Sequence, residues 1–257
     1  MSKIKILECP IKNVESVTKD TFKIELESEY LAKNSYPGQF LHIKIDEDLS
    51  LRRPFSIHRI KKNRVLVLFK VRGRGTFLLS KKQKNQKLNV IGPLGRGFKI
   101  PKVLKEGEII ILAGGGLGIA PLYFLAQKIK DLKFKKNKIF CILGFKEKKD
   151  VICEKDFKSL GFKTYIVTEK TGVKKNLVDF LEEFVKNKKG YIYLCGPKEM
   201  INSLKEKKFK DFRIQVSLEN FLGCGIGMCK ACSILTKEGT KLVCKDGPVF
   251  DIEDLKI

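Results

Sequence analysis

Four cysteines near the end of the chain constrain its fold more than any other feature. Cys224, Cys229, Cys232 and Cys244 are separated by four, two and eleven residues. This spacing matches the plant-type ligand run of a [2Fe–2S] cluster, in which three thiolates come from one curled loop and the fourth from elsewhere. In the run 223–227 every second residue is glycine, which permits positive φ and leaves backbone N–H groups free to point at sulfur. The sequence therefore predicts a [2Fe–2S] cluster on these four cysteines.

Two other uses of the cysteines are weaker. A structural zinc site usually has two short Cys-x2-Cys pairs, whereas the gaps here are four and then two residues. Disulfides need an oxidising compartment, and the opening Met1-Ser2-Lys3-Ile4-Lys5-Ile6 has no apolar signal core, so we expect a reducing, cytoplasmic setting. Cys9, Cys141 and Cys153 lack ligand spacing and are expected to pack as small apolar side chains.

Length and charge bound the remaining possibilities. With 257 residues and 43% hydrophobic content, the chain is long enough for two domains and a small appendage. No apolar run approaches the ~18 residues of a membrane span. The 53 Lys and Arg against 29 Asp and Glu give a net charge of +24, but the lysines are spread along the chain without a nucleic-acid motif, which favours a solvated surface. A basic nucleic-acid-binding module stays an alternative, and a colourless purified protein would favour it.

Residues 1–100 have the pattern of β structure. Residues 22–27 and 41–45 alternate between apolar and polar side chains, and residues 64–71 form a more buried run. Short strands separated by turns such as Tyr36-Pro37-Gly38 predict a small antiparallel barrel.

Two short motifs in this region suit a bound dinucleotide. The run 53–56 combines an arginine, a proline-fixed backbone and a serine, and Gly75-Thr76 follows about twenty residues later. A guanidinium binds phosphate bidentately, and hydroxyls can satisfy ring nitrogens. The alternative is an ordinary edge strand and a plain turn.

A strand, a tight loop and a helix follow Pro101. Residues 108–113 are a buried strand pattern, residues 114–121 are glycine-rich, and apolar residues then recur on one helical face. Such a loop lets the backbone approach a pyrophosphate at the helix N-terminus. Pro121 suits the first helical turn, where a missing N–H costs nothing.

Further strands near 139–143, 165–167, 191–194 and 213–218, with a helical stripe over 177–185, predict a parallel sheet covered on both faces. Ligands of such sheets bind beyond the carboxyl ends of the strands. Cys195-Gly196-Pro197 is placed at such an end, where a thiol could lie beside a nicotinamide ring. A buried cysteine and a strand-terminating turn explain it equally well.

Taken in order, these motifs resemble the ferredoxin–NADP reductase-like flavoproteins. Ser217-Leu218-Glu219 leading into the four cysteines resembles the electron-transfer subunit of the NAD-linked dihydroorotate dehydrogenases. The resemblance covers essentially the whole chain. It implies an FAD-binding barrel at 1–100, an NAD-binding α/β domain at 101–216 and a [2Fe–2S] domain at 217–257.

The resemblance also implies residue roles. Arg53 would contact the FAD diphosphate, Ser56 would lie near the reactive edge of the flavin, and Pro54 with Phe55 would hold the backbone between them. The other predicted cofactor-binding residues are Phe69, Lys70 and Val71 beside the flavin, Gly75 and Thr76 at phosphate, and, for NAD, Gly114, Gly115, Gly116, Gly118, Cys195, Gly196 and Pro197.

The resemblance implies that this chain transfers electrons and that a partner subunit oxidises the substrate. We assign no catalytic base, because the two histidines, His42 and His58, are expected to be ordinary strand residues. The chain has no room for an FMN-bearing barrel of ~250 residues, so the resemblance implies an FMN-containing catalytic subunit and a heterotetramer with two copies of each chain. Electrons from dihydroorotate would pass by way of the cluster and FAD to NAD.

The alternative is a flavoprotein subunit of a sulfide dehydrogenase or a ferredoxin:NADP oxidoreductase. These relatives tend to have aspartate at the first cluster position, and Cys224 argues against them.

Overall fold

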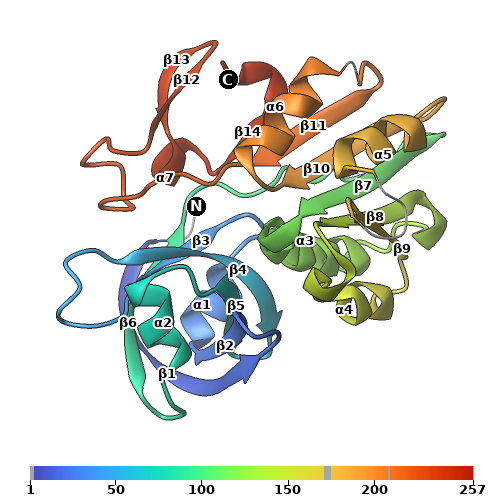
Figure 1. The fold of residues 1–257 in the computed structure, drawn as a ribbon. Coiled ribbons are helices and arrows are strands. Elements are labelled where there is room, and N and C mark those ends of the chain that lie inside the picture. Colours follow the sequence, from blue (N-terminus) through green and yellow to red (C-terminus); the bar gives the residue numbers. More distant parts are fainter. Residues whose placement is uncertain (1–2, 171–174, 208, 257) are drawn as a thin grey trace.

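The computed structural model describes residues 3–170, 175–207 and 209–256, which form a barrel, an α/β sheet and a C-terminal segment (Figure 1). The barrel lies at the lower left of Figure 1, the sheet with its helices at the right, and the C-terminal segment, in red, at the upper left. This arrangement confirms the predicted fold class.

The N-terminal part is a closed antiparallel barrel with the strand order β1-β2-β5-β4-β3-β6. Alternate side chains point inward, so Leu41 and Ile43 of β3 pack against Ile57 of β4 and Val67 of β5 in the barrel core. The strands are β1 Lys5–Ser16, β2 Thr21–Glu27, β3 Phe40–Lys44, β4 Arg53–Lys61, β5 Arg64–Lys70 and β6 Lys87–Leu94, and the helices are α1 Glu29–Asn34 and α2 Arg74–Ser80.

The second part is a six-stranded sheet with the order β14-β11-β10-β7-β8-β9, parallel except for the edge strand β14. Apolar cores lie on both faces, one under α3 and α4 and the other under α5 and α6. The strands are β7 Glu108–Gly115, β8 Ile139–Phe145, β9 Lys163–Thr168, β10 Lys189–Cys195, β11 Phe212–Ser217 and β14 Val249–Asp251, and the helices are α3 Ile119–Asp131, α4 Glu154–Ser159, α5 Leu177–Phe184 and α6 Lys198–Glu206.

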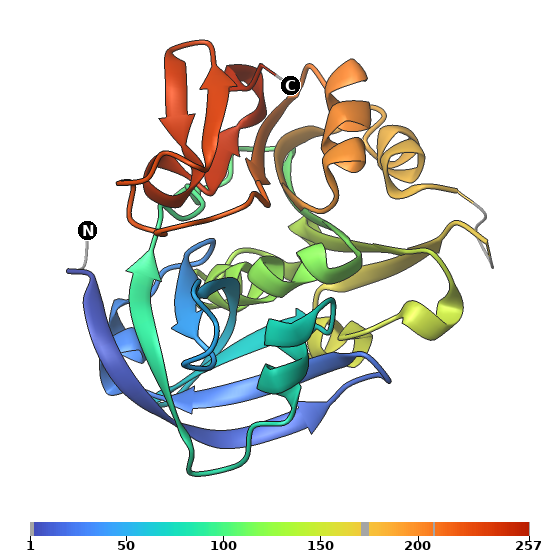
Figure 2. The ribbon, with the colours of Figure 1, turned by 60° about the vertical axis from the view of Figure 1, so that its left-hand side comes forward.

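The C-terminal segment contains a small hairpin, β12 Ser233–Thr236 and β13 Gly239–Leu242, and one turn of helix, α7 Val243–Asp246. In the turned view of Figure 2 it lies above the barrel and beside the helices of the α/β part. The segment then returns to the sheet, where β14 pairs with β11 through Gln215 and Asp251. The range 217–257 therefore contributes a strand to the α/β sheet as well as carrying the cysteines.

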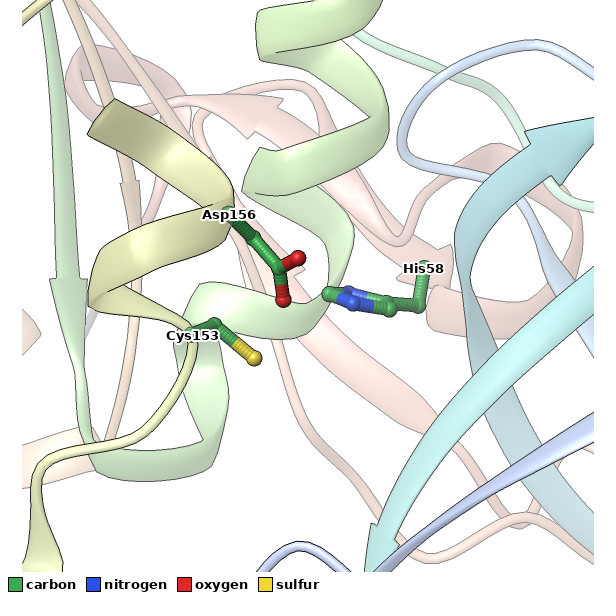
Figure 3. Close-up of side chains that lie close together, drawn as sticks. All are labelled: His58, Cys153 and Asp156. Atoms are coloured by element: carbon green, nitrogen blue, oxygen red, sulfur yellow. The ribbon is translucent and has the colours of Figure 1, made fainter. Parts of the chain in front are cut away.

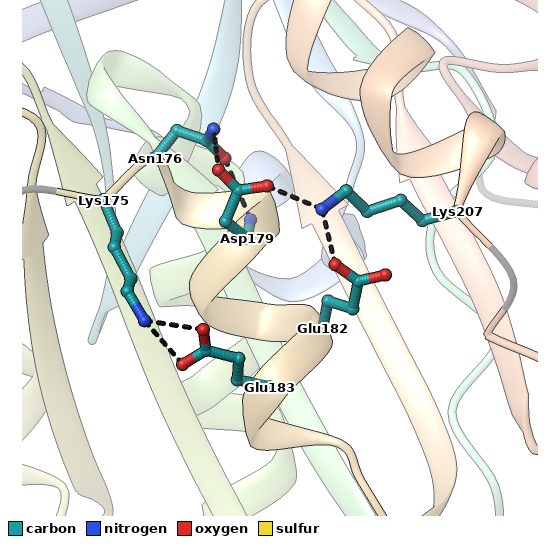
Figure 4. A network of polar contacts seen from close by, with 6 residues as sticks. All are labelled: Lys175, Asn176, Asp179, Glu182, Glu183 and Lys207. Carbon is teal, nitrogen blue, oxygen red and sulfur yellow. Dashed lines mark hydrogen bonds and ion pairs between the residues drawn. The ribbon is translucent and has the colours of Figure 1, made fainter.

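Acidic side chains of α5 pair with Lys207, which follows α6. Lys207 Nζ donates to Asp179 and Glu182 at 2.6 Å each, and the Asn176 side chain caps the helix by accepting from Asp179 N at 2.9 Å (Figure 4). Surface pairs of this kind contribute about 0 to 1 kcal/mol each. The helix is therefore held on the sheet mainly by its buried apolar face. No helix within the described ranges has the length and apolar character to cross a bilayer.

Candidate functional site

A cavity of about 280 Å³ lies where the three parts meet. The barrel contributes Phe40 and Pro54, the α/β part contributes Leu117 and Cys195, and the C-terminal segment contributes Leu222, among others. Sites between domains are common positions for cofactors, so this cavity is the candidate site.

The barrel wall of the cavity contains most of the residues predicted to bind a flavin. They are Pro54, Phe55, Ser56, Phe69, Lys70 and Thr76. The aromatic side chains of Phe55 and Phe69 are in edge contact, with ring centroids 5.7 Å apart, and both are buried. The two aromatic side chains of this wall are therefore already packed in the barrel core, whereas Pro54 is exposed.

Arg53 and Gly75 lie together just outside this lining, and Val71 is outside it as well. A Cβ on Gly75 would be 3.3 Å from Arg53 Nε, so the small residue lets the guanidinium lie against the turn. Arg53 Nη1 donates to the Leu51 carbonyl at 2.6 Å, which holds the side chain against the segment that precedes β4.

The turn before α2 is fixed by a threonine. The Thr76 hydroxyl accepts from the N–H of Arg72 at 2.8 Å and of Gly73 at 3.2 Å. Arg72, which sequence reasoning missed, lines the cavity beside Thr76. The turn thus presents a cation next to a constrained backbone, which suits a phosphate group.

The α/β wall is built at the point where the strand order reverses. β7 has β8 on one side and β10 on the other, and the register places Cys195 of β10 between Gly114 of β7 and Ser217 of β11. Open α/β sheets bind ligands in the crevice at this switch point. The two predicted NAD-binding loops, 114–118 and 195–197, therefore meet at one edge of the sheet.

The glycines of these loops separate into two kinds. A Cβ on Gly118 would lie 2.2 Å from the Cys195 carbonyl oxygen, and Cβ atoms on Gly115 and Gly196 would collide with Met200. Gly118, like Gly114 against Ile119, is required for packing, whereas side chains at Gly115 and Gly196 would have to displace the flexible end of Met200. Gly116 is different, because it has φ +54° and its Cβ would meet nothing within 4 Å. Open space beside a left-handed backbone is what a ligand phosphate approaching the chain requires.

Two titratable side chains line the cavity near the carboxyl ends of the strands. Burial raises the pKa of the Cys195 thiol well above its usual range, so the thiol stays protonated. Glu219, whose role the sequence analysis left open, also lines the cavity, and desolvation by the cavity walls raises the pKa of its carboxyl. Its place in Ser217-Leu218-Glu219 was the only available signal.

The four predicted ligand cysteines come together as two pairs. Cys224 Sγ accepts from the backbone N–H of Met228 at 3.3 Å and of Cys229 at 3.4 Å, and Cys229 Sγ accepts from Cys224 N at 3.4 Å. In the second pair, Cys232 and Cys244 are buried, with their sulfurs 3.3 Å apart. All eight cysteines are free thiols.

The electrostatics of the cysteines agree with a shared site. Burial alone would raise the pKa of Cys224, but the backbone N–H donors of the loop outweigh it and bring the pKa to about 6. Burial, and then the neighbouring thiols of Cys232 and Cys224, raise the pKa of Cys244 to about 12. The thiolate of Cys224 is thus stabilised by backbone donors. The buried cysteines would repel one another if both were deprotonated, unless a cation lay between them. The residues therefore fit an iron–sulfur cluster.

The cysteines and the cavity are direct neighbours in the chain. Leu222 and Val243 line the cavity, and they precede Cys224 by two residues and Cys244 by one. A cluster on these cysteines would therefore lie beside the cavity wall.

A second group of potential ligands lies between the barrel and the α/β part. Potential ligand atoms of His58, Cys153 and Asp156 are within 4.8 Å of one another (Figure 3). However, Lys23 Nζ lies 2.8 Å from Asp156 and Arg59 Nη1 lies 3.9 Å from it. Because two cations already neutralise the carboxylate, we interpret the group as an ion-pair network that joins β2 and β4 to α4.

His58 is held in this network by a hydrogen bond. Its Nδ1 lies 3.0 Å from the Ala120 carbonyl oxygen on α3, and its ring packs 5.1 Å from that of Tyr123. Burial lowers the pKa of His58 to about 4. Both histidines do lie on strands, as expected, but each is buried at a contact between parts of the molecule. Of the other cysteines, Cys9 and Cys141 are buried in apolar cores as predicted, whereas Cys153 is only partly buried.

Comparison with known proteins agrees with the site. The sequence model of the iron–sulfur cluster binding domain of dihydroorotate dehydrogenase B matches residues 219–256, and that of the oxidoreductase NAD-binding domain matches residues 112–206. A solved NADH-dependent reduced ferredoxin-NADP oxidoreductase structure has a TM-score of 0.85 and 27% identity, covering 96% of this chain and 89% of that one. A ferredoxin NADP+ reductase from Neisseria gonorrhoeae, at 16% identity and TM-score 0.67 over 83% of this chain and 99% of that one, shares the fold.

Two curated relatives extend over nearly the full length. The dihydroorotate dehydrogenase B (NAD(+)) electron transfer subunit of Shouchella clausii is 34% identical over 95% of each chain. Its counterpart in Caldanaerobacter subterraneus is 37% identical over 90% of this chain and 91% of the relative.

The fold and the site define a pyridine-nucleotide-linked oxidoreductase with an iron–sulfur domain. More closely, the chain belongs to the family of dihydroorotate dehydrogenase B electron transfer subunits. The family resemblance drawn from the sequence is thereby confirmed.

Proposed function

We propose that this chain carries electrons from dihydroorotate, oxidised on an FMN-containing partner subunit, by way of a [2Fe–2S] cluster and FAD to NAD, as a step of pyrimidine biosynthesis. A nicotinamide exchanges two electrons as hydride, an iron–sulfur cluster exchanges one, and a flavin can do either. The observation that carries the proposal is the shared cavity, whose walls come from the barrel, the α/β sheet and the cysteine segment.

The residues of each wall have separate tasks. The barrel wall with Pro54, Phe55 and Ser56 would hold the flavin, and Arg53 with the 72–76 turn would bind its diphosphate. The open backbone at Gly116 would receive the pyrophosphate of NAD, with Cys195 beside the nicotinamide. We propose domain boundaries at about 100 and 216, consistent with matches to residues 112–206 and 219–256.

An apolar surface beside the cysteines supports the partner. Phe221 is 92% exposed and Met228 77% exposed, and Ile226 between them is exposed as well. Apolar side chains in such numbers beside a redox site mark an interaction surface. We propose that the FMN subunit covers this loop, in a heterotetramer of two copies of each chain, and that the protein works in the reducing cytoplasm that its free thiols favour.

Reconstitution tests the proposal. The chain alone should oxidise NADH with artificial acceptors but leave dihydroorotate unchanged. Adding an FMN-containing dihydroorotate dehydrogenase subunit should give a complex on gel filtration and reduction of NAD by dihydroorotate. Met228→Glu should weaken the complex while leaving NADH oxidation intact, and Leu235→Glu, exposed on the hairpin at 62%, is the matched control.

A second candidate rests on one observation, the 27% identity to the NADH-dependent reduced ferredoxin-NADP oxidoreductase structure. This candidate function is ferredoxin-linked electron transfer to a nicotinamide. Fast ferredoxin-dependent turnover, together with failure to bind the FMN subunit, would favour it over the first.

A further inference from the structure

His42 is the one buried histidine of the described residues without a hydrogen bond of ordinary geometry. It is 1% exposed, and neither ring nitrogen has such a partner among the described residues. His58, equally buried, has the Ala120 carbonyl. A buried polar group without a hydrogen bond destabilises the fold, so its presence calls for an explanation such as a redox role or an absent partner.

The ring of His42 lies directly beneath the cysteine loop. A Cβ on Gly225 would be only 2.5 Å from His42 Nδ1, and Gly225 has φ +74°. Only glycine permits both this backbone conformation and this approach. The loop therefore rests on the imidazole next to Cys224.

The same strand leads from this ring to the cavity. His42 lies across from Pro54 in the β3–β4 pair, and Phe40 is two residues away on the same face of β3. Both Pro54 and Phe40 line the cavity. The ring thus lies between the candidate flavin site and the first cysteine of the cluster loop.

The ring supplies a hydrogen-bond donor beside the loop. Whichever ring nitrogen holds the proton, the imidazole carries an N–H, and Nδ1 lies directly under Gly225, the residue after Cys224.

We propose that His42 is a positioning residue for electron transfer, which supports the cluster loop against the barrel wall and directs an N–H at the Cys224 end of the cluster. A cluster that gains one electron gains one negative charge. An N–H held beside the cluster loop therefore favours the reduced form and raises the reduction potential.

The inference rests on the proposed function, because it requires a cluster. His42→Gln and His42→Met are a matched pair, since the side chains have similar length and only glutamine donates an N–H. Each variant and the wild-type chain are titrated with dithionite and redox mediators, and the reduced cluster is followed by electron paramagnetic resonance. Iron, acid-labile sulfide and flavin are measured on the same samples.

We expect His42→Met to shift the one-electron equilibrium about tenfold against the reduced cluster, which corresponds to about 59 mV. His42→Gln should stay within about twofold of wild type. His58→Gln is the control and should leave the potential unchanged, since His58 faces α3.

Each outcome decides the matter. Loss of iron from the Met variant alone, with iron and potential kept in the Gln variant, supports the proposal. Equal potentials in the wild type and both variants overturn it, as does loss of iron from both variants, which would leave His42 a packing role only. Absence of iron and sulfide from the wild-type chain would instead refute the proposed function.

Discussion

The barrel wall of the cavity and the cysteine loop are held by different forces. In the barrel wall, Phe55 and Phe69 are buried and contact one another. On the loop side, Phe221 and Met228 are exposed, and the loop is held mainly by backbone N–H groups donated to cysteine sulfur. The first wall is held by apolar packing, whereas the loop would gain folding free energy from a bound cluster.

The largest effect should come from breaking the loop. Replacing any one of Cys224, Cys229, Cys232 or Cys244 with alanine should remove most of the iron and leave the flavin bound, because the barrel wall does not depend on the loop. Iron, acid-labile sulfide and flavin analysis measures this. Cys141→Ala, which removes a buried thiol elsewhere, should retain iron. Two irons per chain in all four ligand variants would contradict the assignment of the cluster to these cysteines.

The next largest effect is expected at the glycine-rich loop of the α/β part. Gly116→Val should leave flavin content unchanged and slow flavin reduction by NADH at least tenfold, since the side chain would occupy the open space beside the loop. Stopped-flow bleaching measures the rate. Gly239→Val is the matched control, because Gly239 also has positive φ, +98°, with nothing within 4 Å of its Cβ. A normal rate in Gly116→Val would place the nucleotide elsewhere.

A smaller effect is expected at the diphosphate. Arg53→Ala should weaken FAD binding by roughly 2 to 3 kcal/mol, because a charge-assisted pair with phosphate is lost. Arg64→Ala removes a guanidinium that pairs with Glu25 on the same barrel, and it should leave FAD affinity unchanged. Equal affinities of both variants for FAD would remove Arg53 from the site.

The smallest effect tests how the barrel and the α/β part are joined. The pKa of His58 is about 4 in the folded chain against 6.5 unfolded, so below pH 6.5 the unfolded chain binds more protons and stability falls until about pH 4. The loss is about 2 kcal/mol at pH 5 relative to pH 8. Urea unfolding at both pH values should show a smaller drop for His58→Gln than for wild type. An identical drop in the two proteins would contradict the buried neutral ring.

The features found from the sequence are those set by neighbouring residues. The cysteine spacing, the glycine-rich loop after β7 and the alternation of β2 and β3 depend on short stretches of chain, so the barrel, the parallel sheet and the iron–sulfur segment could be predicted. β14 could not, because its three residues carry no periodic signal and its partner β11 lies more than thirty residues earlier.

The interactions that were missed join distant parts of the chain. His42 meets Gly225, and His58 meets Ala120 and Asp156, only after the barrel has packed against the other two parts. The burial of Glu219, which raises the pKa of its carboxyl, depends likewise on three walls enclosing one cavity. Sequence patterns specify which elements form, but these contacts depend on how the elements are packed.

The most direct test of the central claim, that flavin and cluster exchange electrons within this chain, is the anaerobic addition of NADH to the purified protein without its partner. Absorbance follows the flavin, and electron paramagnetic resonance of samples frozen at successive times follows the cluster. The account predicts that the flavin bleaches first and that a reduced-cluster signal then appears in the same molecules. Bleaching of the flavin with a cluster that stays oxidised under excess NADH, although dithionite reduces it, would contradict the account.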